Sequence, residues 1–362
     1  MTRSNKGFAQ ILELNQFDEI IDVRSPAEFA EDHIPGAVNC PVLDNAQRAE
    51  IGTLYVQVSP FEARKLGAAW VAENIARHLR EHFIARPRSW RPLLYCWRGG
   101  QRSGSFTTWM RMIGWDACQL VGGYKTYRAA VLESLASQPA RFQFQVLCGP
   151  TGSGKTRILQ ALAEAGAQAL DLEALAAHRG SVLGALPEQE QPPQKWFETQ
   201  LNHTLAGFDP RRPVFIEAES RRIGKIHLPE SLFQTMHRSP CIVLDAARGA
   251  RLELLLEDYA YLGQNPADLQ SKLNRLKGLQ SNAVLARWND LAGQGQLATL
   301  FDELLTLHYD PLYQRSQERN YEHMDVTPPL QISRLDAEGV RDAAQRILAQ
   351  ATYAAIHCPQ QG

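Results

Sequence analysis

The chain has 362 residues, of which 44% are apolar and 21% are charged, and its formal net charge is −1. At about 150 residues per domain, this length predicts two or three globular domains. The near-neutral charge excludes a basic field over the whole molecule, so any RNA site has to be a local patch. The six cysteines are too few and too scattered for a disulfide scaffold, and the absence of a C-x-x-C pair argues against a zinc ribbon.

The N-terminal residues MTRSNKGFAQ (1–10) have neither the apolar stretch nor the cleavage pattern of a signal peptide. The apolar runs all fall short of the roughly 18 residues that a membrane-spanning helix needs. We therefore expect a cytoplasmic protein with no membrane partner, in a reducing compartment where a cysteine stays a thiol.

Short apolar runs alternate with helical patterns over the first third of the chain. Strands are predicted at 19–24, 92–96 and 117–123. Helices are predicted at 25–33, 61–84 and 103–113, and the first of them begins with a Ser cap followed by Pro. Strands that alternate with helices predict a parallel sheet.

A second alternating region follows the segment SLASQPARFQ (134–143), which is the best candidate for a linker. Strands are predicted at 142–148, 213–220 and 241–246, with a helix at 157–167, and from about residue 248 the pattern is almost wholly helical. We therefore expect domains over 1–137 and 138–247, with 248–362 as a mostly helical extension of the second.

The segment LLYCWRGGQRSGS (93–105) places Cys96 between a predicted strand and a glycine-bearing loop that leads into a helix. The backbone N–H groups of such a loop, together with the helix N-terminus, form an anion-binding nest. Arg98 and Arg102 add positive charge. This setting lowers the pKa of a thiol from about 8.5 and makes it nucleophilic. The cysteines that lack such a loop are expected to be structural: Cys40, Cys118, Cys148, Cys241 and Cys358.

Three segments, EIIDVRSPAEF (19–29), DHIPGAVNCPV (32–42) and YCWRGGQRS (95–103), resemble a rhodanese-homology domain over roughly residues 8–136. That family moves sulfur or selenium through a persulfide or perselenide on the loop cysteine. The Cys-x5-Arg spacing also resembles the loop of the related dual-specificity phosphatases, which holds a phosphate-sized group. Loop shape alone therefore leaves chalcogen transfer and phosphatase chemistry both open.

The segment GPTGSGKT (149–156) matches G-x-x-x-x-G-K-[ST] between a predicted strand and a predicted helix. Its backbone amides wrap an anion, while Lys155 reaches the terminal phosphate and Thr156 holds Mg²⁺. The expected phosphate-binding residues are Gly149, Thr151, Gly152, Ser153, Gly154, Lys155 and Thr156. The ligand is a di- or triphosphate whose remaining part the motif does not specify.

A second acidic position is expected near this loop. Glu217 follows an apolar run and is the candidate, in competition with Asp171 and Asp245, which also end apolar segments. The segment CIVLDAARGARLELLLEDY (241–259) resembles the third strand and helix of small P-loop kinases, which favours a nucleotide ligand.

Two further patterns are weaker. In ESRRIGK (219–225) the residues Arg221, Arg222 and Lys225 are either RNA or phosphate contacts or a solvated loop. The sequence His78-Leu-Arg-Glu81-His82 matches a zinc-peptidase pattern, but it lies on an expected solvated helix face with no third ligand evident. No metal-ligating residue is predicted there.

Four segments together resemble the tRNA 2-selenouridine synthase family over nearly the whole chain: YCWRGGQRSGS, LVGGYKTYR, GPTGSGKT and EAESRRIGKIHLP. The resemblance implies a transferase that converts wobble 2-thiouridine in tRNA to 2-selenouridine. It alkylates the thiocarbonyl sulfur with geranyl diphosphate and then replaces the S-geranyl group with selenium from selenophosphate. The implied fold class is α/β: a rhodanese-like parallel-sheet domain followed by a P-loop NTPase-like domain with a helical C-terminal region.

By this resemblance Cys96 carries selenium, Arg98 and Arg102 steady the anionic donor, and residues 149–156 bind diphosphate. The helices after 248 would house the geranyl chain, and an enzyme that supplies selenophosphate is an implied partner. A P-loop kinase or ATPase with a rhodanese-like phosphatase or sulfur-transfer module is the main alternative, and a binding module with an inert rhodanese domain is the third.

Overall fold

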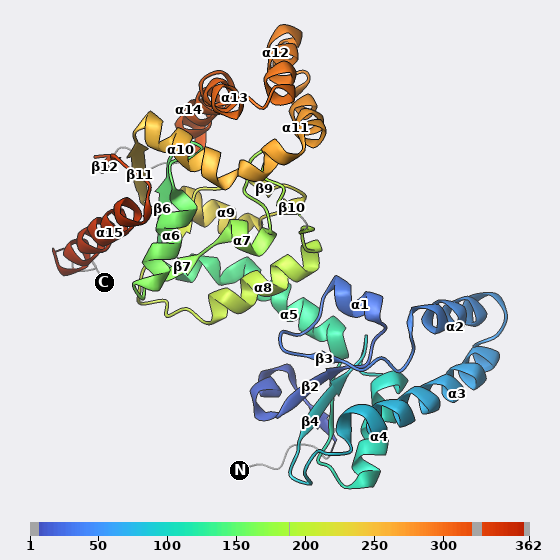
Figure 1. The fold of residues 1–362 in the computed structure, drawn as a ribbon. Helices are drawn as coiled ribbons and strands as arrows, with labels where there is room; N and C mark the ends of the chain where they lie inside the picture. Colours follow the sequence, from blue (N-terminus) through green and yellow to red (C-terminus); the bar gives the residue numbers. More distant parts are fainter. Residues whose placement is uncertain (1–6, 188, 321–327, 358–362) are drawn as a thin grey trace. The chain divides into compact units, whose positions relative to one another are not determined.

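The structure is a computed structural model that describes residues 7–187, 189–320 and 328–357 (Figure 1). It contains two compact units. The N-terminal unit runs to Ser134 and includes Lys195–His203, and the P-loop unit holds Leu135–Gln194 and the chain from Thr204 onward. In the part of the chain that the structure describes, every helix is too short or too polar to cross a membrane.

The N-terminal unit is built on a five-stranded parallel sheet with the order β1-β5-β4-β2-β3. Its strands are β1 (Phe8–Ala9), β2 (Glu19–Asp22), β3 (Val38–Asn39), β4 (Pro92–Tyr95) and β5 (Cys118–Leu120). Its helices are η1 (Ile11–Gln16), α1 (Pro26–Glu31), α2 (Asn45–Gln57), α3 (Pro60–His78), η2 (Leu79–Phe83), α4 (Gln101–Ile113) and α5 (Gly123–Ser137).

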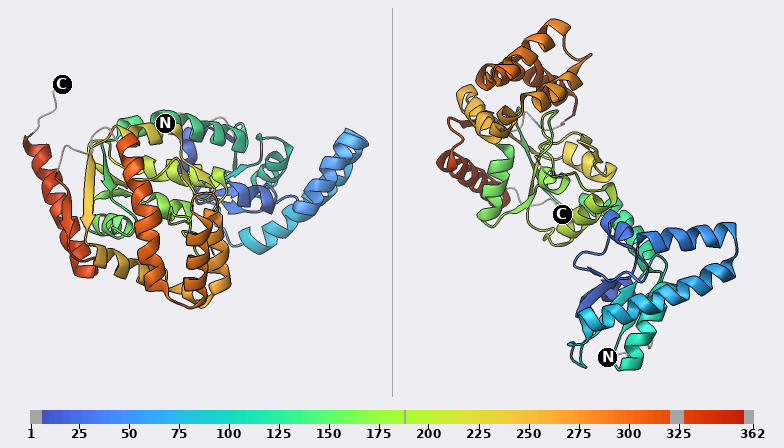
Figure 2. Two further views of the ribbon diagram at one scale, coloured as in Figure 1. Left: turned by 90° about the horizontal axis from the view of Figure 1, so that it is seen from above. Right: turned by 45° about the vertical axis from the view of Figure 1, so that its right-hand side comes forward.

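Local sequence explains these elements. The central strand β4 has all of its residues buried, as a continuous apolar run in a parallel sheet requires. Helix α1 begins at a capping box in which Ser25 and Glu28 bond each other's backbone N–H, with Pro26 in the first turn. Helices α2 and α3 pair as a hairpin that reaches beyond the sheet of this unit (Figure 2).

The P-loop unit contains a second five-stranded parallel sheet with the order β12-β11-β6-β8-β7. Its strands are β6 (Phe144–Cys148), β7 (Gln168–Leu170), β8 (Val214–Glu217), β11 (Cys241–Ala246) and β12 (Leu330–Ile332), and a separate hairpin is formed by β9 (Arg222–Ile223) and β10 (Ile226–His227). The helices before β11 are η3 (Pro139–Arg141), α6 (Lys155–Glu164), α7 (Leu172–Ala176), α8 (Gln194–Ala206, which the N-terminal unit shares) and α9 (Glu230–His237).

The chain after β11 forms a helical layer at one end of this sheet (Figure 1). Its elements are α10 (Arg248–Asp258), η4 (Ala260–Gln264), α11 (Pro266–Leu273), η5 (Asn274–Leu276), α12 (Asn282–Gly293), α13 (Leu297–Leu304), η6 (Leu305–Tyr309), α14 (Asp310–Asn320) and α15 (Ala337–His357). Trp288 is fully buried at the centre of α10–α13. Helix α15 returns to the sheet and packs beside α6.

The α/β class with parallel sheets is confirmed. The boundary between the two units, at Ser134 and Leu135, lies within the predicted linker 134–143, which is helical where α5 continues to Ser137 and η3 covers Pro139–Arg141. The region after 248 is mostly helical, and the strand β12 adds an edge to the sheet beside β11. Its three-residue run, Leu330–Ile332, is too short to give a strand pattern in sequence.

Candidate active sites

The thiol of Cys96 lies at the carboxyl end of β4, inside a loop that closes around it. The residue is only 3% exposed. Its Sγ accepts hydrogen bonds from the Gly100 N–H at 3.2 Å and from the Ser103 hydroxyl at 3.1 Å. Burial on its own raises the pKa of this thiol. The hydrogen bonds from Ser103 and Gly100 and the charge of Arg102 outweigh burial and lower the pKa of Cys96 below its ordinary value, which favours the thiolate.

The loop keeps its shape because a second glycine-rich segment lies directly behind it. Gly99 has φ +64°, and a Cβ there would meet the Leu120 carbonyl oxygen at 2.7 Å. Gly123 has φ +57°, and a Cβ there would lie 2.3 Å from the Cys96 carbonyl oxygen. The Tyr124 N–H donates to that same oxygen at 2.8 Å. The segment LVGGYKTYR therefore supports the cysteine loop.

The two arginines of the loop have different surroundings. Arg102 donates to Glu28 Oε2 at 2.8 Å, and Glu28 itself is fixed by the Ser25 N–H. This pairing holds the Arg102 guanidinium at the loop. Arg98 is exposed, and no acidic side chain among the described residues forms an ion pair with it. Arg102 is thus a positioned cation, whereas Arg98 is solvated.

Gln119 on β5 is a site residue that the sequence did not reveal. It is 6% exposed, and its Nε2 donates to Ser103 Oγ at 2.8 Å and to the Gly100 carbonyl oxygen at 2.9 Å. Because the Ser103 oxygen already accepts from Gln119, its own proton points to Cys96 Sγ. The only sequence signal was a polar residue in the middle of an apolar strand.

A cavity of about 650 Å³ adjoins the cysteine loop. Gln101 and Arg102 form the wall on the side of the loop, and helices α2 and α3 form the others. The remaining wall is mainly apolar: Leu43, Ile51, Tyr55, Ala63, Gly67, Ala68 and Val71, with Arg64 and Ser105. The α2–α3 hairpin therefore provides an apolar chamber beside the nucleophile.

The other described cysteines are buried and have no glycine loop of this kind. Burial raises the pKa of Cys40 to about 12 and also raises the pKa of Cys118. Cys148 shares a hydrogen bond with Cys241, which lowers the pKa of Cys241 and, together with burial, raises the pKa of Cys148. Cys358 lies outside the described residues.

The second site is the phosphate loop that joins β6 to α6. Gly152 and Gly154 have φ of +79° and +80°, so the loop adopts turns that favour glycine. Lys155 Nζ donates to the Gly149 carbonyl oxygen at 3.0 Å. Arg251 from α10, 7% exposed, donates to the Thr151 carbonyl oxygen at 2.8 Å and forms an ion pair with Asp310. Arg251 supports the loop from outside the motif, and no sequence pattern points to it.

Carboxylates converge on the hydroxyl of Thr156. Its Oγ1 lies 3.0 Å from Glu173 Oε2 and 3.1 Å from Glu217 Oε2. Glu217 is fully buried at the end of β8, and its other oxygen accepts the Glu173 N–H at 2.9 Å. Glu219 shares a hydrogen bond with Glu173. Because parallel strands end at one edge of a sheet, residues after β7 and β8 meet there.

Burial and mutual repulsion set the protonation of this carboxylate cluster, which we define as Glu173, Glu217 and Glu219. Burial, followed by the charge of Glu173, raises the pKa of Glu219 to about 8. The same two causes hold the pKa of Glu217 well above its ordinary value. Burial raises the pKa of Glu173 despite Lys155. The cluster therefore holds protons or a cation rather than three free charges.

Of the competing acids, neither occupies the position of Glu217. Asp171 caps α7 by accepting the Ala174 N–H at 2.8 Å. Asp245 is exposed and accepts from Gln331 Nε2 at 2.7 Å. Glu173 and Glu219 were missed because neither follows an apolar run directly.

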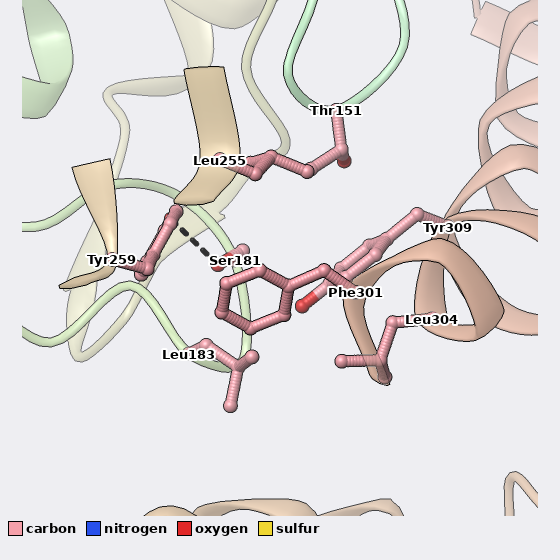
Figure 3. A pocket seen from close by; sticks show the side chains of 8 residues that line it. All are labelled: Thr151, Ser181, Leu183, Leu255, Tyr259, Phe301, Leu304 and Tyr309. Carbon is pink, nitrogen blue, oxygen red and sulfur yellow. Dashed lines mark hydrogen bonds between the residues drawn. The ribbon is translucent and has the colours of Figure 1, made fainter. Parts of the chain in front are cut away.

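An aromatic and aliphatic wall faces the phosphate loop. The loop opens into a cavity of about 410 Å³ whose lining includes Glu219, Leu255, Tyr259 and Tyr309. Figure 3 shows an adjoining apolar pocket of only about 10 Å³, where Phe301 of α13 packs against Tyr259, and Ser181 bonds the Tyr259 hydroxyl. The phosphate loop thus combines an anion cradle with a wall suited to a hydrocarbon chain.

Known proteins share both halves of this chain. Residues 142–283 match the family described as "tRNA 2-selenouridine synthase AAA domain", and residues 4–130 match "Rhodanese-like domain". A protein of Alcanivorax borkumensis named "tRNA 2-selenouridine synthase" is 33% identical over 326 residues, covering 81% of this chain and 88% of that protein. The chain belongs to the tRNA 2-selenouridine synthase family.

Two other members of the tRNA 2-selenouridine synthase family are similar to this chain. The Bdellovibrio bacteriovorus protein is 31% identical over 88% of this chain and 93% of its own length. The Nitrosomonas europaea protein is 37% identical, but the match spans 66% of this chain and 63% of that protein. Family membership thus rests on matches that include both the cysteine loop and the phosphate loop.

The basic cluster of this family member lies on the β9–β10 hairpin. Arg222 and Lys225 are exposed. Arg221 pairs with Glu230 at 2.7 Å and stacks on Phe233. Arg128, a basic residue of the segment LVGGYKTYR, forms an ion pair with Glu198 within the N-terminal unit. Arg222 and Lys225 therefore remain accessible to a polyanion.

The His78–Glu81–His82 pattern serves packing. His78 is 5% exposed, its Nε2 lies 2.9 Å from the Pro41 carbonyl oxygen, and burial lowers its pKa. Over residues 7–187, 189–320 and 328–357, no group of three or more His, Cys, Asp or Glu side chains has the arrangement of a metal site.

Proposed function

We propose that this chain converts 2-thiouridine in tRNA to 2-selenouridine in two steps, S-geranylation with geranyl diphosphate and then selenation from selenophosphate. One observation carries the proposal. A single chain of this family has two anion cradles, of which one holds a thiol with a lowered pKa and the other faces an apolar wall. Two anionic donors, one selenium-bearing and one prenyl-bearing, match these two settings.

The phosphate loop takes the diphosphate of geranyl diphosphate. Lys155 and the loop amides bind the leaving group, and the developing charge on that group is what an anion cradle stabilises. The 410 Å³ cavity beside the loop holds the hydrocarbon chain against Leu255, Tyr259 and Tyr309. Aromatic faces also stabilise positive charge on an allylic carbon as its bond to oxygen breaks.

The residues around Thr156 fit Mg²⁺. Its hydroxyl and the carboxylate of Glu217 form an oxygen donor set, and Mg²⁺ completes its shell with substrate phosphates and water rather than an all-protein cage. When bound, Mg²⁺ would neutralise the diphosphate. Glu173 and Glu217 crowd around one hydroxyl and Glu219 bonds Glu173, which supports a cation there, since the three charges repel.

Geranylation is a substitution at the first carbon of the geranyl chain. The thiocarbonyl sulfur forms the new C–S bond, the C–O bond to diphosphate breaks, and the nucleobase loses its N3 proton. Glu219 lines the same cavity, and because its raised pKa makes its carboxylate a stronger base than an ordinary one, we assign it as the acceptor of this proton. Alkylation turns C2 into an electrophile that can expel a thiol.

Selenation uses the cysteine loop. Selenophosphate binds in the nest around Cys96, steadied by Arg102, and an enzyme that makes selenophosphate supplies it. The departing geranylthiol leaves from the carbon that selenium attacks, so its chain must lie beside the loop. The 650 Å³ chamber walled by Ile51, Tyr55 and Val71 is the apolar surface next to Arg102, and we assign the chain to it.

The tRNA contributes its own charge to binding. Arg222 and Lys225 are exposed on the β9–β10 hairpin and are the phosphate contacts we assign. Such a contact set is small, in keeping with a formal net charge of −1. The enzyme acts in the cytoplasm, where its tRNA substrate is found.

Nucleoside mass spectrometry tests the proposal. Thiouridine tRNA incubated with the protein and geranyl diphosphate should yield S-geranyl-2-thiouridine, and adding selenophosphate should convert it to 2-selenouridine. ATP in place of geranyl diphosphate should give neither product. Hydrolysis of ATP that thiouridine tRNA stimulates, with no S-geranyl product, would instead favour a P-loop ATPase with a rhodanese-like module.

A further inference from the structure

We infer that Cys96 acts on phosphorus rather than on selenium, and that it becomes transiently phosphorylated when the P–Se bond is broken. The inference rests on the proposed function, because it assumes selenophosphate as the donor. It replaces the perselenide on Cys96 that the family resemblance implies. Three features of the site carry it: the cradle, the hydroxyl on the sulfur and the electron balance.

The cradle brings the Cys96 sulfur together with a fixed cation, as a site for an oxyanion requires. Arg102 lies six positions after Cys96, and the loop between them folds back so that the Gly100 N–H reaches the sulfur. Both terminal nitrogens of Arg102 donate to Glu28, at 2.8 and 3.4 Å, which holds the guanidinium at the loop and leaves its charge and its remaining N–H groups for the oxygens of a phosphoryl group. Selenide alone has no oxygen atoms to use such donors.

The hydroxyl of Ser103 is aimed at the sulfur. It donates to Cys96 Sγ at 3.1 Å, and Gln119 fixes its orientation by donating to the same oxygen at 2.8 Å. A hydrogen bond to the sulfur stabilises the thiolate, both as the attacking group and as the group that leaves when a P–S bond is hydrolysed. An arrangement that makes sulfur a better leaving group fits a covalent intermediate that has to be broken by water.

The electron balance also favours phosphorus. Forming an S–Se bond on Cys96 from selenophosphate removes two electrons and needs an oxidant, which neither the site nor the proposed substrates supply. Displacement at phosphorus needs none. Attack in line with the P–Se bond leaves selenium on the far side of phosphorus from Cys96, facing the acceptor.

The bonds can then form and break in an order that needs no oxidant or reductant. Selenium of the bound donor forms a bond to C2, the C2–S bond breaks, and geranylthiol leaves with one proton. The Cys96 thiolate next attacks phosphorus, the S–P bond forms, and the P–Se bond breaks to release 2-selenouridine. Water finally attacks the phosphocysteine, the P–S bond breaks, and phosphate leaves as the thiolate is restored. Selenium stays bonded throughout and is never released as selenide.

The test uses the full chain, S-geranyl tRNA prepared in advance, and selenophosphate. Reactions are quenched in acid during turnover, and the peptide containing Cys96 is analysed by mass spectrometry. The wild-type peptide should carry a phosphoryl group. Ser103→Ala should slow release of phosphate by about tenfold and raise the phosphorylated fraction. Thr108→Ala is the matched control, since its exposed hydroxyl bonds only the Gly104 carbonyl of its own helix.

Each outcome decides the matter. Phosphate on Cys96, increased by Ser103→Ala and absent in Cys96→Ser, supports the inference. Selenium on Cys96, or an unmodified Cys96 peptide while 2-selenouridine forms, overturns it. If Ser103→Ala does not fold, the wild-type sample quenched during turnover decides alone. Absence of any 2-selenouridine from wild type would instead refute the proposed function, so the two failures are distinguishable.

Discussion

The chain uses one backbone device twice. In each unit a buried parallel strand ends in a glycine-bearing loop and a helix follows, at Cys96 in the first and at Gly149 in the second. Around Cys96 the neighbouring groups are hydrogen-bond donors, and the pKa of the thiol is lowered. Around Thr156 the neighbours are carboxylates, and their pKa values are raised.

The contrast shows how side chains decide the chemistry of a shared loop. Donors around Cys96 already complement an anion, so the loop can receive a charged donor and attack it. Acceptors around Thr156 leave the phosphate loop short of positive charge, so its ligand has to arrive with a cation or with protons. Under the proposed function, the apolar wall of Leu255 and Tyr259 would favour a prenyl diphosphate over inorganic diphosphate.

The largest effect should come from Cys96→Ser. A serine hydroxyl does not ionise in this nest, so selenation should fall to the background rate. Geranylation should be unchanged, and S-geranyl-2-thiouridine should accumulate in nucleoside mass spectra. Cys118→Ser, a buried cysteine with no anion nest, is the control. If Cys96→Ser formed 2-selenouridine at the wild-type rate, the cysteine loop would not be the site of selenation and the two loops would not have separate roles.

The second-largest effect should come from Lys155→Ala. Without the cation that faces the diphosphate leaving group, geranylation should slow roughly a hundred- to a thousandfold. The fold should remain, because the hydrogen bond of Lys155 Nζ goes to the Gly149 carbonyl oxygen of the loop itself, and the carboxylates that its charge favours can hold protons. The initial rate of S-geranyl product formation measures the effect, and an unchanged rate would take the phosphate loop out of this step.

Substitutions of the two loop arginines should change the rate of selenation by different amounts. Arg102→Lys keeps the charge but loses the fork that Glu28 positions, so selenation of S-geranyl tRNA should slow by about tenfold. Arg98→Lys should change the rate much less, because Arg98 is solvated. Single-turnover rates with saturating selenophosphate make the comparison. If both variants lost the same fraction of the selenation rate, the loop would depend on its total positive charge and not on the position of one guanidinium.

The protonation of the carboxylate cluster should make the stability of the protein depend on pH. Its folded pKa values are raised, so the folded state binds more protons than the unfolded state between the ordinary carboxyl range and about pH 8. The free energy of unfolding therefore falls as pH rises through this window. Tm without metal should drop by roughly 5 °C. Mg²⁺ should reverse the drop, and Glu219→Gln should reduce it. A Tm that is flat in pH would contradict the charges assigned to the cluster.

Sequence reasoning found what is local and missed what the fold brings together. The strands, the cysteine loop and the phosphate loop lie in contiguous segments with regular patterns. Glu173 and Gln119 could not be found, because each becomes part of a site only when parallel strands align their ends. Arg251 and the α2–α3 chamber depend on packing between elements far apart in the chain. Glu217 was preferred over Asp171 and Asp245 by pattern alone, and it is the acid that lies at Thr156.

The central claim is that each loop performs one half-reaction. Its most direct test is to give Lys155→Ala a tRNA already S-geranylated by Cys96→Ser, together with selenophosphate, and to measure 2-selenouridine by mass spectrometry. The account predicts that Lys155→Ala forms 2-selenouridine from this tRNA at close to the wild-type rate, although it forms almost none from 2-thiouridine tRNA and geranyl diphosphate. Failure of a folded Lys155→Ala to selenate the S-geranyl tRNA would contradict it, because the phosphate loop would then be needed for both steps.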